Sequence, residues 1–385
     1  MRAIVVRLDN DGDVLLAGPA IRAVAAGADH VTLLCGPRGA QAAKLLPGVD
    51  EIVVRRAEWI DPDAPPVDRA GVDAYVDRIA AIGADAAVIL TSFHQSALPT
   101  ALLLRMAGVP RIAAISEDFP GSLLDVRHRV DEDVHEVQRG LSVAATLGFA
   151  LPPGDDGALR VHAADPPAGV ELPDRFVAVH PGASVPARAW EPDANRALVA
   201  ALAAAGRSVV VTGAPSERAL TAHVTAGWFR SANQQLAEQN HPNMAPAGGS
   251  VERTSGSQNG TTAPGGSGGD EGPAVLDLGG ATSLAELAGV LARADAVVVG
   301  NTGPAHLAAA VGTPVVSLFA PTVPAVKWRP WSVPHELLFV DVPCAGCRAR
   351  ECPVAGHPCL SQVPVEDVLA ALDRLTAPIR KAVAA

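Results

Sequence analysis

The stretch Val297–Thr322, VVVGNTGPAHLAAAVGTPVVSLFAPT, indicates how the protein folds. A strand-sized apolar run ends at Gly300, an alanine-rich segment begins at Pro304, and a second apolar run follows Gly312. A strand, a glycine-containing turn, a helix and another strand in this order are typical of a parallel sheet covered by helices. The break after the first run therefore lies at the carboxyl end of a strand, where open α/β sheets bind ligands.

The rest of the chain repeats this alternation in two series. The first predicts strands at 3–8, 31–35, 51–54, 86–90 and 111–115, and helices at 14–26, 38–46, 72–82, 96–106 and 130–147. The second predicts strands at 176–180, 208–212, 275–278, 296–299 and 315–319, and helices at 194–205, 216–225, 284–292 and 304–310. Because 385 residues exceed the usual size of one hydrophobic core, we predict two α/β domains, each built on a parallel sheet.

A stretch rich in proline, glycine and aspartate separates the two series and indicates a linker. We predict an N-terminal domain at residues 1–160, a linker at 161–174 and a C-terminal domain at 175–385. Residues 228–272 consist largely of Gly, Ser, Asn, Gln and Thr, and they carry too few apolar side chains to offset the entropy of ordering. We predict a disordered insertion there, and a final helix at Val365–Leu375 that packs back across the first domain.

The composition excludes several classes of protein. A net charge of −11 disfavours a nucleic-acid surface, so an anionic ligand would need local cations. The longest apolar runs are strand-sized, well short of a bilayer span, and the start, MRAIVVRLDNDGD, lacks the apolar core of a signal peptide. We therefore expect a soluble cytoplasmic protein that binds no nucleic acid.

The turn inside the opening stretch is a candidate phosphate site. Thr302 or Gly303 can cap the helix, Gly303 allows a ligand to approach the backbone, and Pro304 suits the first helical position. The free N–H groups and the dipole of the helix then favour an anion. The same join also occurs as plain turn chemistry, and His306 is either a ligand contact or a buried core histidine. Both alternatives stay open on this stretch alone.

Two neighbouring strand ends carry residues of a similar kind. Gly182, Ser184 and Arg188 follow one strand, and Gly213 and Glu217 follow the next. The serine and arginine offer a hydroxyl and a permanent cation to a diphosphate, and the glutamate offers a carboxylate to ribose hydroxyls. A surface arginine or glutamate usually only faces water, so each signal is weak by itself. Together the strand ends predict one cleft of nucleotide size.

In the first domain, the loop Asp9–Asp13 joins the first strand to the first helix. Asp13 could act as a general base if it faces a cleft, or it could merely cap the helix. The loop lacks G-x-G-x-x-G, and no G-x-x-x-x-G-K-[ST] occurs in the chain, which argues against dinucleotide oxidoreductases and P-loop kinases. Further along, His135 and Glu136 could contact an acceptor, although a solvated helix face is the simpler interpretation.

Four of the five cysteines cluster near the C-terminus with the spacing C-x2-C-x4-C-x6-C: Cys344, Cys347, Cys352 and Cys359. The number of thiols is enough for a zinc site, but the spacing matches known zinc modules only loosely. Reduced thiols or disulfides that pin a loop are the alternatives. We expect a structural role and keep zinc as the alternative.

In order and spacing, these motifs resemble glycosyltransferase family 9, the ADP-heptose:lipopolysaccharide heptosyltransferase family, over nearly the whole chain apart from the insertion. The resemblance rests on Gly12-Asp13-Val14, His180-Pro181-Gly182-Ala183-Ser184 with Arg188 and Trp190, Gly213-x-x-x-Glu217-Arg218, Asn301-Thr302-Gly303-Pro304-Ala305-His306-Leu307, and the cysteine-rich segment. It implies two Rossmann-like domains of the GT-B type with the active site in the cleft between them. The acceptor would bind to the first domain and the nucleotide sugar chiefly to the second.

The resemblance also implies roles for individual residues. Asp13 matches the catalytic base, and Gly12, Gly182 and Gly213 match supporting positions. The donor-binding positions are Ser184, Arg188, Glu217, Asn301, Thr302, Gly303, Pro304 and His306. The family commonly has lysine where Arg188 stands and aspartate where Asn301 stands. The loss of that carboxylate at position 301 leaves the identity of the donor sugar open.

The function that the resemblance implies is inverting transfer of a sugar, with heptose as the expected sugar, from an ADP-sugar to a hydroxyl group. The acceptor would be a glycan, a glycolipid or a small metabolite, no cofactor would be required, and peripheral membrane association is compatible with it. Two alternatives stay open: a GT-B-fold sugar-nucleotide epimerase or hydrolase, and a sugar-nucleotide-binding protein without catalysis.

Overall fold

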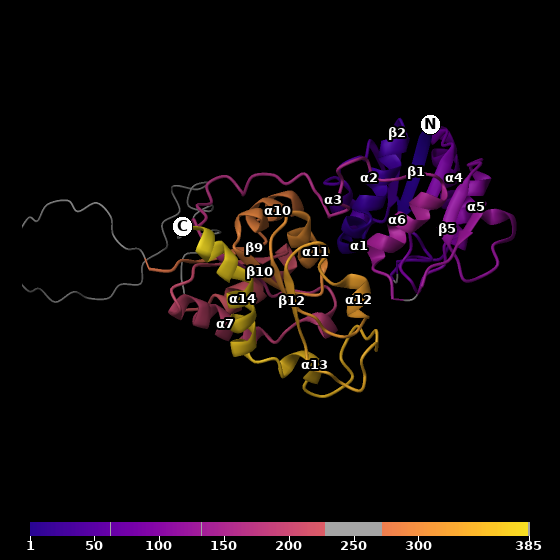
Figure 1. Ribbon diagram of the computed structural model, residues 1–385. Coiled ribbons are helices and arrows are strands. Elements are labelled where there is room, and N and C mark those ends of the chain that lie inside the picture. The colour runs from indigo at the N-terminus through magenta and orange to yellow at the C-terminus, as the bar shows by residue number, and fades with distance from the viewer. Residues whose placement is uncertain (62, 132, 228–271, 384–385) are drawn as a thin grey trace, which may run out of the picture.

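The computed structural model describes residues 1–61, 63–131, 133–227 and 272–383 (Figure 1). The insertion predicted at 228–272 lies outside the described residues except for its last position. The first domain, indigo to magenta in Figure 1, and the second, rose to yellow, each contain one sheet.

The first sheet has six parallel strands in the order β3-β2-β1-β4-β5-β6. The strands are β1 (Arg2–Arg7), β2 (His30–Cys35), β3 (Glu51–Val54), β4 (Ala86–Ile89), β5 (Ile112–Ile115) and β6 (Val126–His128). The main helices are α1 (Asp11–Leu16), α2 (Gly18–Gly27), α3 (Ala40–Ala43), α4 (Arg69–Ile82), α5 (Leu98–Met106) and α6 (Glu136–Thr146). Helices α2 and α6 cover one face and α4 and α5 the other, so the apolar strands are buried on both sides.

The second sheet repeats this topology in the order β12-β11-β10-β7-β8-β9, again all parallel. Its strands are β7 (Val177–His180), β8 (Val209–Gly213), β9 (Val275–Gly279), β10 (Ala296–Gly300), β11 (Val315–Leu318) and β12 (His335–Leu338). Its helices are α7 (Pro192–Ala204), α8 (Arg218–Val224), α10 (Leu284–Arg293), α11 (Gly303–Ala310), α12 (Ala325–Trp328), α13 (Pro358–Ser361) and α14 (Val365–Val383). The predicted α/β class with two parallel sheets is confirmed.

Both sheets reverse their strand order at an inner pair, β1 with β4 in the first and β7 with β10 in the second. At such a switch point the loops that follow the two strands diverge to opposite faces and leave a crevice at the carboxyl edge. The loop after β1 carries Asp13, and the loop after β10 carries Thr302 and Gly303. The topology thus places the predicted base and the predicted phosphate site at equivalent points of the two domains.

Some local predictions were wrong. The single helix predicted at 14–26 is two helices, α1 and α2, which meet at Ala17, because Pro19 has no N–H to continue the helical hydrogen bonds. The edge strands β6 and β12 were not predicted, since Val126–His128 and His335–Leu338 are short and partly polar and show no apolar run.

The final helix does not pack back across the first domain as predicted. Val368, Ala371 and Leu372 of α14 are buried in the same cluster as Val316 and Leu318 of β11. Their spacing puts them on one face of a helix, and the second sheet covers that face. In Figure 1, α14 accordingly lies over the second domain, on the side away from the first.

The two domains are in direct contact through α1 and α11. Leu16 of α1 shares a buried cluster with Ala309 and Ala310 of α11 and with Leu159, just before the predicted linker. The linker then passes along α10, where the N–H of Ala164 donates to the carbonyl of Ala285 at 3.1 Å. The contact aligns the amino ends of α1 and α11.

Candidate active site

The amino ends of α1 and α11 meet without side chains between them. A Cβ atom added to Gly12 would lie 3.1 Å from Cα of Gly303 and 3.2 Å from Cδ2 of His306. A side chain at position 12 would therefore press directly on the backbone of the other domain. The glycines that the sequence singled out in two distant motifs thus form one contact, which brings the two switch points together.

Asp13 lies in the first turn of α1, on the first-domain side of this contact. Its Oδ1 accepts a hydrogen bond from Nη2 of Arg7 at 2.8 Å, and its side chain is 18% exposed. The helix begins at Asp11, Asn10 is its N-cap, and no side chain caps it, so the helix-capping interpretation of Asp13 was wrong. The carboxylate is therefore held by a cation and still reaches the surface.

The other two carboxylates of the loop have partners of their own. Oδ1 of Asp11 accepts from the N–H of Ala42 at 2.9 Å, and burial raises the pKa of Asp11. Oδ2 of Asp9 lies 2.9 Å from Nε of Arg7. Burial, partly offset by the charge of Arg7, raises the pKa of Asp9 to about 6. Each acid thus has a different environment, which is how the loop accommodates three carboxylates.

Arg7 is the residue at this site that sequence reasoning missed. It is 4% exposed and contacts Asp9, Asp13 and Glu136 as well as Oγ of Ser92, 2.9 Å from its Nη2. The available signal was a charged residue at the end of the otherwise apolar strand β1, because an arginine in a buried position needs partners.

On the second-domain side, His306 lies in α11 and is 5% exposed. Burial lowers the pKa of His306 to about 4; the negative charge of Asp13 opposes this shift and the positive charge of Arg188 adds to it. Burial also lowers the pKa of Arg188, again against the influence of Asp13. These mutual effects mean that Asp13, Arg188 and His306 lie close enough to feel one another's charge across the domain contact.

Several buried polar atoms on the second-domain side have no hydrogen-bond partner among the described residues. They are Nε of Arg188, Oδ1 of Asn301, Nδ1 of His306 and Oγ1 of Thr322. Nδ2 of Asn301 does donate to the carbonyl of Ala320 at 3.1 Å, so the orientation of the amide is fixed and its Oδ1 has no hydrogen-bond donor among the described residues. Buried polar groups are usually paired, and unpaired ones at the carboxyl ends of β7, β10 and β11 mark where a polar ligand would gain hydrogen bonds.

Glu217 is held inside the loops instead of facing open solvent. Its Oε2 accepts from the N–H of Ala214 at 2.7 Å and lies 3.6 Å from Nε2 of His180. A Cβ added to Gly182 would lie 2.1 Å from Oε1 of Glu217, and one added to Gly213 would lie 2.8 Å from Cγ2 of Thr221. A side chain at either position would therefore displace a neighbour, the carboxylate of Glu217 in one case and Thr221 in the other. The predicted ribose contact of Glu217 stays a prediction.

The remaining donor-binding candidates lie at the same edge of the sheet. Thr302 is the N-cap of α11, in extended conformation and without a side-chain cap bond; Gly303 is the first helical residue and Pro304 the second. The N–H of Thr302 donates to the carbonyl of Gly300 at 2.8 Å and that of Ala305 to the carbonyl of Thr302 at 3.0 Å, so the N–H of Gly303 is the one that this turn offers to an anion. Ser184 is exposed in the loop after β7.

The cysteine-rich segment forms a loop beside this site. Cys344, Cys347, Cys352 and Cys359 line one pocket together with His357, and the burial of Cys359 raises the pKa of its thiol. Within the described ranges of the chain, no three His, Cys, Asp or Glu side chains are gathered closely enough to hold a metal ion. The zinc alternative thus gains no support from the geometry and remains a question for metal analysis.

This loop also reaches the first domain. The guanidinium carbon of Arg348 lies 4.4 Å from the centre of the Phe93 ring, which also contacts Trp328 with ring centres 5.5 Å apart. Phe93 follows β4, at the switch point of the first sheet. The aromatic and cationic contacts therefore join the cysteine-rich loop and α12 to the first domain beside its switch point.

Comparison with known proteins agrees with this geometry. The family model for glycosyltransferase family 9 (heptosyltransferase) matches residues 81–238 and 270–357. Lipopolysaccharide heptosyltransferase 3 of Escherichia coli is 34% identical over 109 residues, which are 27% of this chain and 30% of that protein. Lipopolysaccharide heptosyltransferase 1 of Pseudomonas aeruginosa is 35% identical over 133 residues, 34% of each protein. These matches span about a third of the length of the relatives.

Solved structures of similar shape extend the fold likeness to the whole chain. ADP-heptose lps heptosyltransferase II of E. coli superposes with a TM-score of 0.66 at 16% identity, covering 99% of this chain and 100% of that one. E. coli heptosyltransferase WaaC with ADP gives a TM-score of 0.64 at 17% identity, covering 97% and 100%. At such identities the likeness shows the fold alone.

Two Rossmann-like domains that face each other at their switch points define the architecture, which is of the GT-B type. The family model matches well over half of the residues, so the chain belongs to glycosyltransferase family 9 (heptosyltransferase). None of the helices within the described residues combines the length and the apolar character that crossing a membrane requires.

Proposed function

We propose that the protein is an inverting glycosyltransferase that moves heptose from ADP-heptose to a hydroxyl group of a glycan, a glycolipid or a small metabolite. The observation that carries the proposal is the contact of Gly12 with Gly303, which sets the carboxylate of Asp13 opposite the amino end of α11. Family membership supports it, as does the fold likeness to E. coli WaaC, solved with ADP-2-deoxy-2-fluoro heptose.

In the proposed reaction Asp13 is the general base. Its carboxylate takes the proton of the acceptor hydroxyl while that oxygen bonds to the anomeric carbon of the donor. The bond from the anomeric carbon to the diphosphate oxygen breaks on the opposite face, and ADP leaves with the bonding electrons. The ion pair with Arg7 holds the carboxylate in place before the reaction, and the 18% exposure of Asp13 leaves room for the hydroxyl.

The leaving diphosphate would be stabilised by groups of the second domain that are in place before the reaction. Arg188 supplies a positive charge, and the turn supplies the N–H of Gly303 at the amino end of α11. His306 is neutral at pH 7, since its pKa is about 4, so it offers hydrogen bonding and no charge. These groups compensate the developing charge by themselves, so we propose that no metal cofactor is required.

We expect Asn301 to bind the donor sugar and to contribute to its selection. Its Oδ1 is buried and unpartnered among the described residues, and it can accept a hydrogen bond from a sugar hydroxyl. The amide carries no charge, unlike the aspartate common in the family, so the hydroxyl pattern of the preferred sugar is the open part of the proposal. A protein working in the cytoplasm, with its acceptor in solution or at a membrane surface, fits this scheme.

The proposal is tested by following ADP release from ADP-heptose with and without candidate acceptors. We expect stimulation of ADP release by an acceptor, an inverted anomeric centre in the product, and thermal stabilisation by ADP over UDP and GDP. Consumption of the donor without any acceptor would point to an epimerase or hydrolase. Binding without any consumption would point to a protein that only binds the nucleotide sugar.

A further inference from the structure

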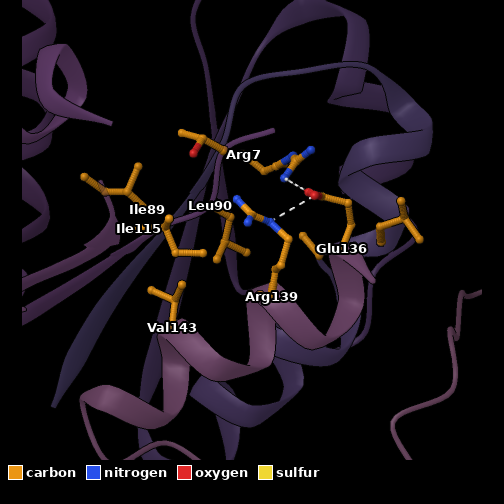
Figure 2. A pocket seen from close by; sticks show the side chains of 11 residues that line it. Arg7, Ile89, Leu90, Ile115, Glu136, Arg139 and Val143 are labelled. Carbon is orange, nitrogen blue, oxygen red and sulfur yellow. Dashed lines mark hydrogen bonds and ion pairs between the residues drawn. The ribbon is translucent and has the colours of Figure 1, made fainter. Parts of the chain in front are cut away.

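A chain of buried ion pairs runs behind Asp13 into the first domain. Arg7, at the end of β1, places Nη2 2.8 Å from Oδ1 of Asp13 and Nη1 3.4 Å from Oε2 of Glu136. On its other side, Oε1 of Glu136 lies 3.0 Å from Nε of Arg139. Figure 2 shows the carboxylate of Glu136 between the two guanidinium groups. The chain thus links helix α6 to the proposed base.

The surroundings of this chain are largely apolar on the side away from Asp13. Leu90 and Val143 are among the apolar side chains that face Arg139 in Figure 2, and they line the same small cavity as Arg7 and Glu136. The side chains of Arg7 and Glu136 are 4% and 1% exposed. In such surroundings an unpaired charge is costly, so each group fixes the position of the next.

Each nitrogen of the Arg7 guanidinium lies next to a partner. Nη1 donates to Glu136 and Nη2 to both Asp13 and Oγ of Ser92, and Nε forms an ion pair with Asp9 that lacks hydrogen-bond geometry. Asp13, by contrast, has one described hydrogen bond, the one from Arg7. A lysine would offer a single point charge and could not reach all these partners in fixed directions. The geometry therefore makes Arg7 the group that decides where the carboxylate of Asp13 points.

We propose that Arg7 is a positioning residue for the general base, and that Glu136, backed by Arg139, sets how strongly Arg7 holds it. This inference rests on the proposed function of Asp13 and deepens it. Arg7 does not touch the reacting atoms; it orients Asp13 and places a positive charge beside it. A merely structural ion-pair chain would stabilise the fold without affecting the titration of the base.

The test is whether replacing Arg7 and replacing Glu136 shift the pH profile of kcat in opposite directions. Removing a cation beside a general base raises the pH at which catalysis sets in, so in Arg7→Met we expect the acidic limb of the kcat profile to move up by about 1–3 pH units. We also expect kcat on the pH plateau to fall by about 10²-fold, because the base loses the group that orients it. Without the anion of Glu136, Arg7 is less neutralised, so in Glu136→Gln the acidic limb moves down. Arg7→Lys keeps the limb near its wild-type position and recovers part of kcat.

Other charged groups around Asp13 require controls. Arg188 and His306 face it from the second domain, and His94 follows β4. These three stay unchanged in every variant. Asp9 also pairs with Arg7, and its pKa is about 6, so Asp9→Asn is measured alongside. If the acidic limb vanished in Asp9→Asn, it would report Asp9, and the inference would be overturned.

The matched control for stability is another buried ion pair of the first domain. Nε and Nη2 of Arg22 bind the two carboxylate oxygens of Asp155 at 2.7 and 2.9 Å, away from the domain contact. We expect Arg22→Met to lower Tm while the pH profile stays in place. If Arg7→Met and Glu136→Gln only lowered Tm and left the limb where it is in the wild type, the chain would be structural and the inference wrong. Absence of transferase activity in the wild type would instead overturn the proposed function.

Discussion

The two walls of the cleft differ in how their polar groups are satisfied. On the first-domain wall, Arg7, Asp9, Asp13, Glu136 and Arg139 are all joined by ion pairs. On the second-domain wall, Nε of Arg188, Oδ1 of Asn301, Nδ1 of His306 and Oγ1 of Thr322 have neither a hydrogen bond nor an ion pair within the described part of the chain. The charges of the first wall are thus compensated within the protein, even where Nε of Arg7 and Oε1 of Glu136 lack hydrogen-bond geometry, whereas the second wall keeps buried polar atoms that a ligand can pair.

This difference indicates a division of labour. A general base has to be oriented and ionised before the substrate arrives, which an internal ion-pair chain can do. A donor-binding surface has to exchange water for ligand, so its atoms must remain available. The same strand order thus serves two tasks, because the loops at the two switch points carry different side chains.

Replacing the base should give the largest effect. We expect Asp13→Ala to lower turnover by about 10³-fold, since the other carboxylates of the loop are held elsewhere, Asp9 by Gln95 and Asp11 by the N–H of Ala42. Turnover is measured as ADP release at saturating donor and acceptor. Asp13→Asn keeps the shape and should be equally inactive; substantial activity in either variant would exclude Asp13 as the base.

Replacing Arg188, the cation of the second-domain wall, should give the next largest loss of activity. Removing one group that stabilises charge in the transition state costs about 10²- to 10³-fold, so we expect a loss in this range for Arg188→Met. Arg188→Lys keeps the charge and should retain more activity. Equal activity of wild type and Arg188→Met in the same ADP-release assay would mean that the diphosphate lies elsewhere.

Adding a side chain at position 12, where the two domains touch, should lower activity less. In Gly12→Ala the new Cβ lies 3.1 Å from Cα of Gly303, so the domains must separate by a few tenths of an ångström. We expect kcat to fall on the order of 10-fold, because a misplacement of this size affects the alignment of base and donor. Gly71→Ala in α4, where the nearest atom is the flexible carboxylate of Asp68, is the control and should leave kcat unchanged. Full activity of Gly12→Ala would show that the contact is not needed.

Acidification should destabilise the fold through buried histidines. Burial lowers the pKa of His135 and of His306 to about 4, below the value of about 6.5 in an unfolded chain. The unfolded chain therefore binds more protons between these values, and the free energy of unfolding falls as pH drops below about 6.5, by about 1 kcal/mol for each histidine at pH 5.5.

Urea unfolding of the wild type and of His135→Asn at pH 7.5 and pH 5.5 measures this difference. Nδ1 of His135 caps α6 by accepting from the N–H of Val137 at 3.2 Å, and an asparagine oxygen can do the same without titrating. We expect a smaller pH dependence in the variant. An unchanged pH dependence would mean that His135 is not a neutral group in the folded protein.

The sequence predicted the parts of the fold that depend on local pattern. Apolar runs located the inner strands, and Gly303 and Pro304 marked the start of α11. The short edge strands β6 and β12 escaped because half-buried polar residues form them. Where the pattern was local and strongly apolar, the structure agrees with it.

The predictions that failed concern contacts between distant segments. His135 and Glu136 were expected on a solvated helix face, but they are 2% and 4% exposed. Glu136 is buried because Arg7, far away in the sequence, supplies its counter-charge. No local pattern contains such a pair, nor the contact between Gly12 and Gly303. The motifs thus named candidate residues, and only the fold showed which of them meet.

Calorimetric titration of ADP into Asp13→Ala and Arg188→Met tests the division of labour most directly. We predict that Asp13→Ala binds ADP as tightly as the wild type or more tightly, since the variant removes a negative charge. Arg188→Met should bind ADP at least about 10-fold more weakly, because a charge-assisted contact is lost. The reverse pattern, with weakened binding in Asp13→Ala and wild-type affinity in Arg188→Met, would contradict the assignment of the two walls.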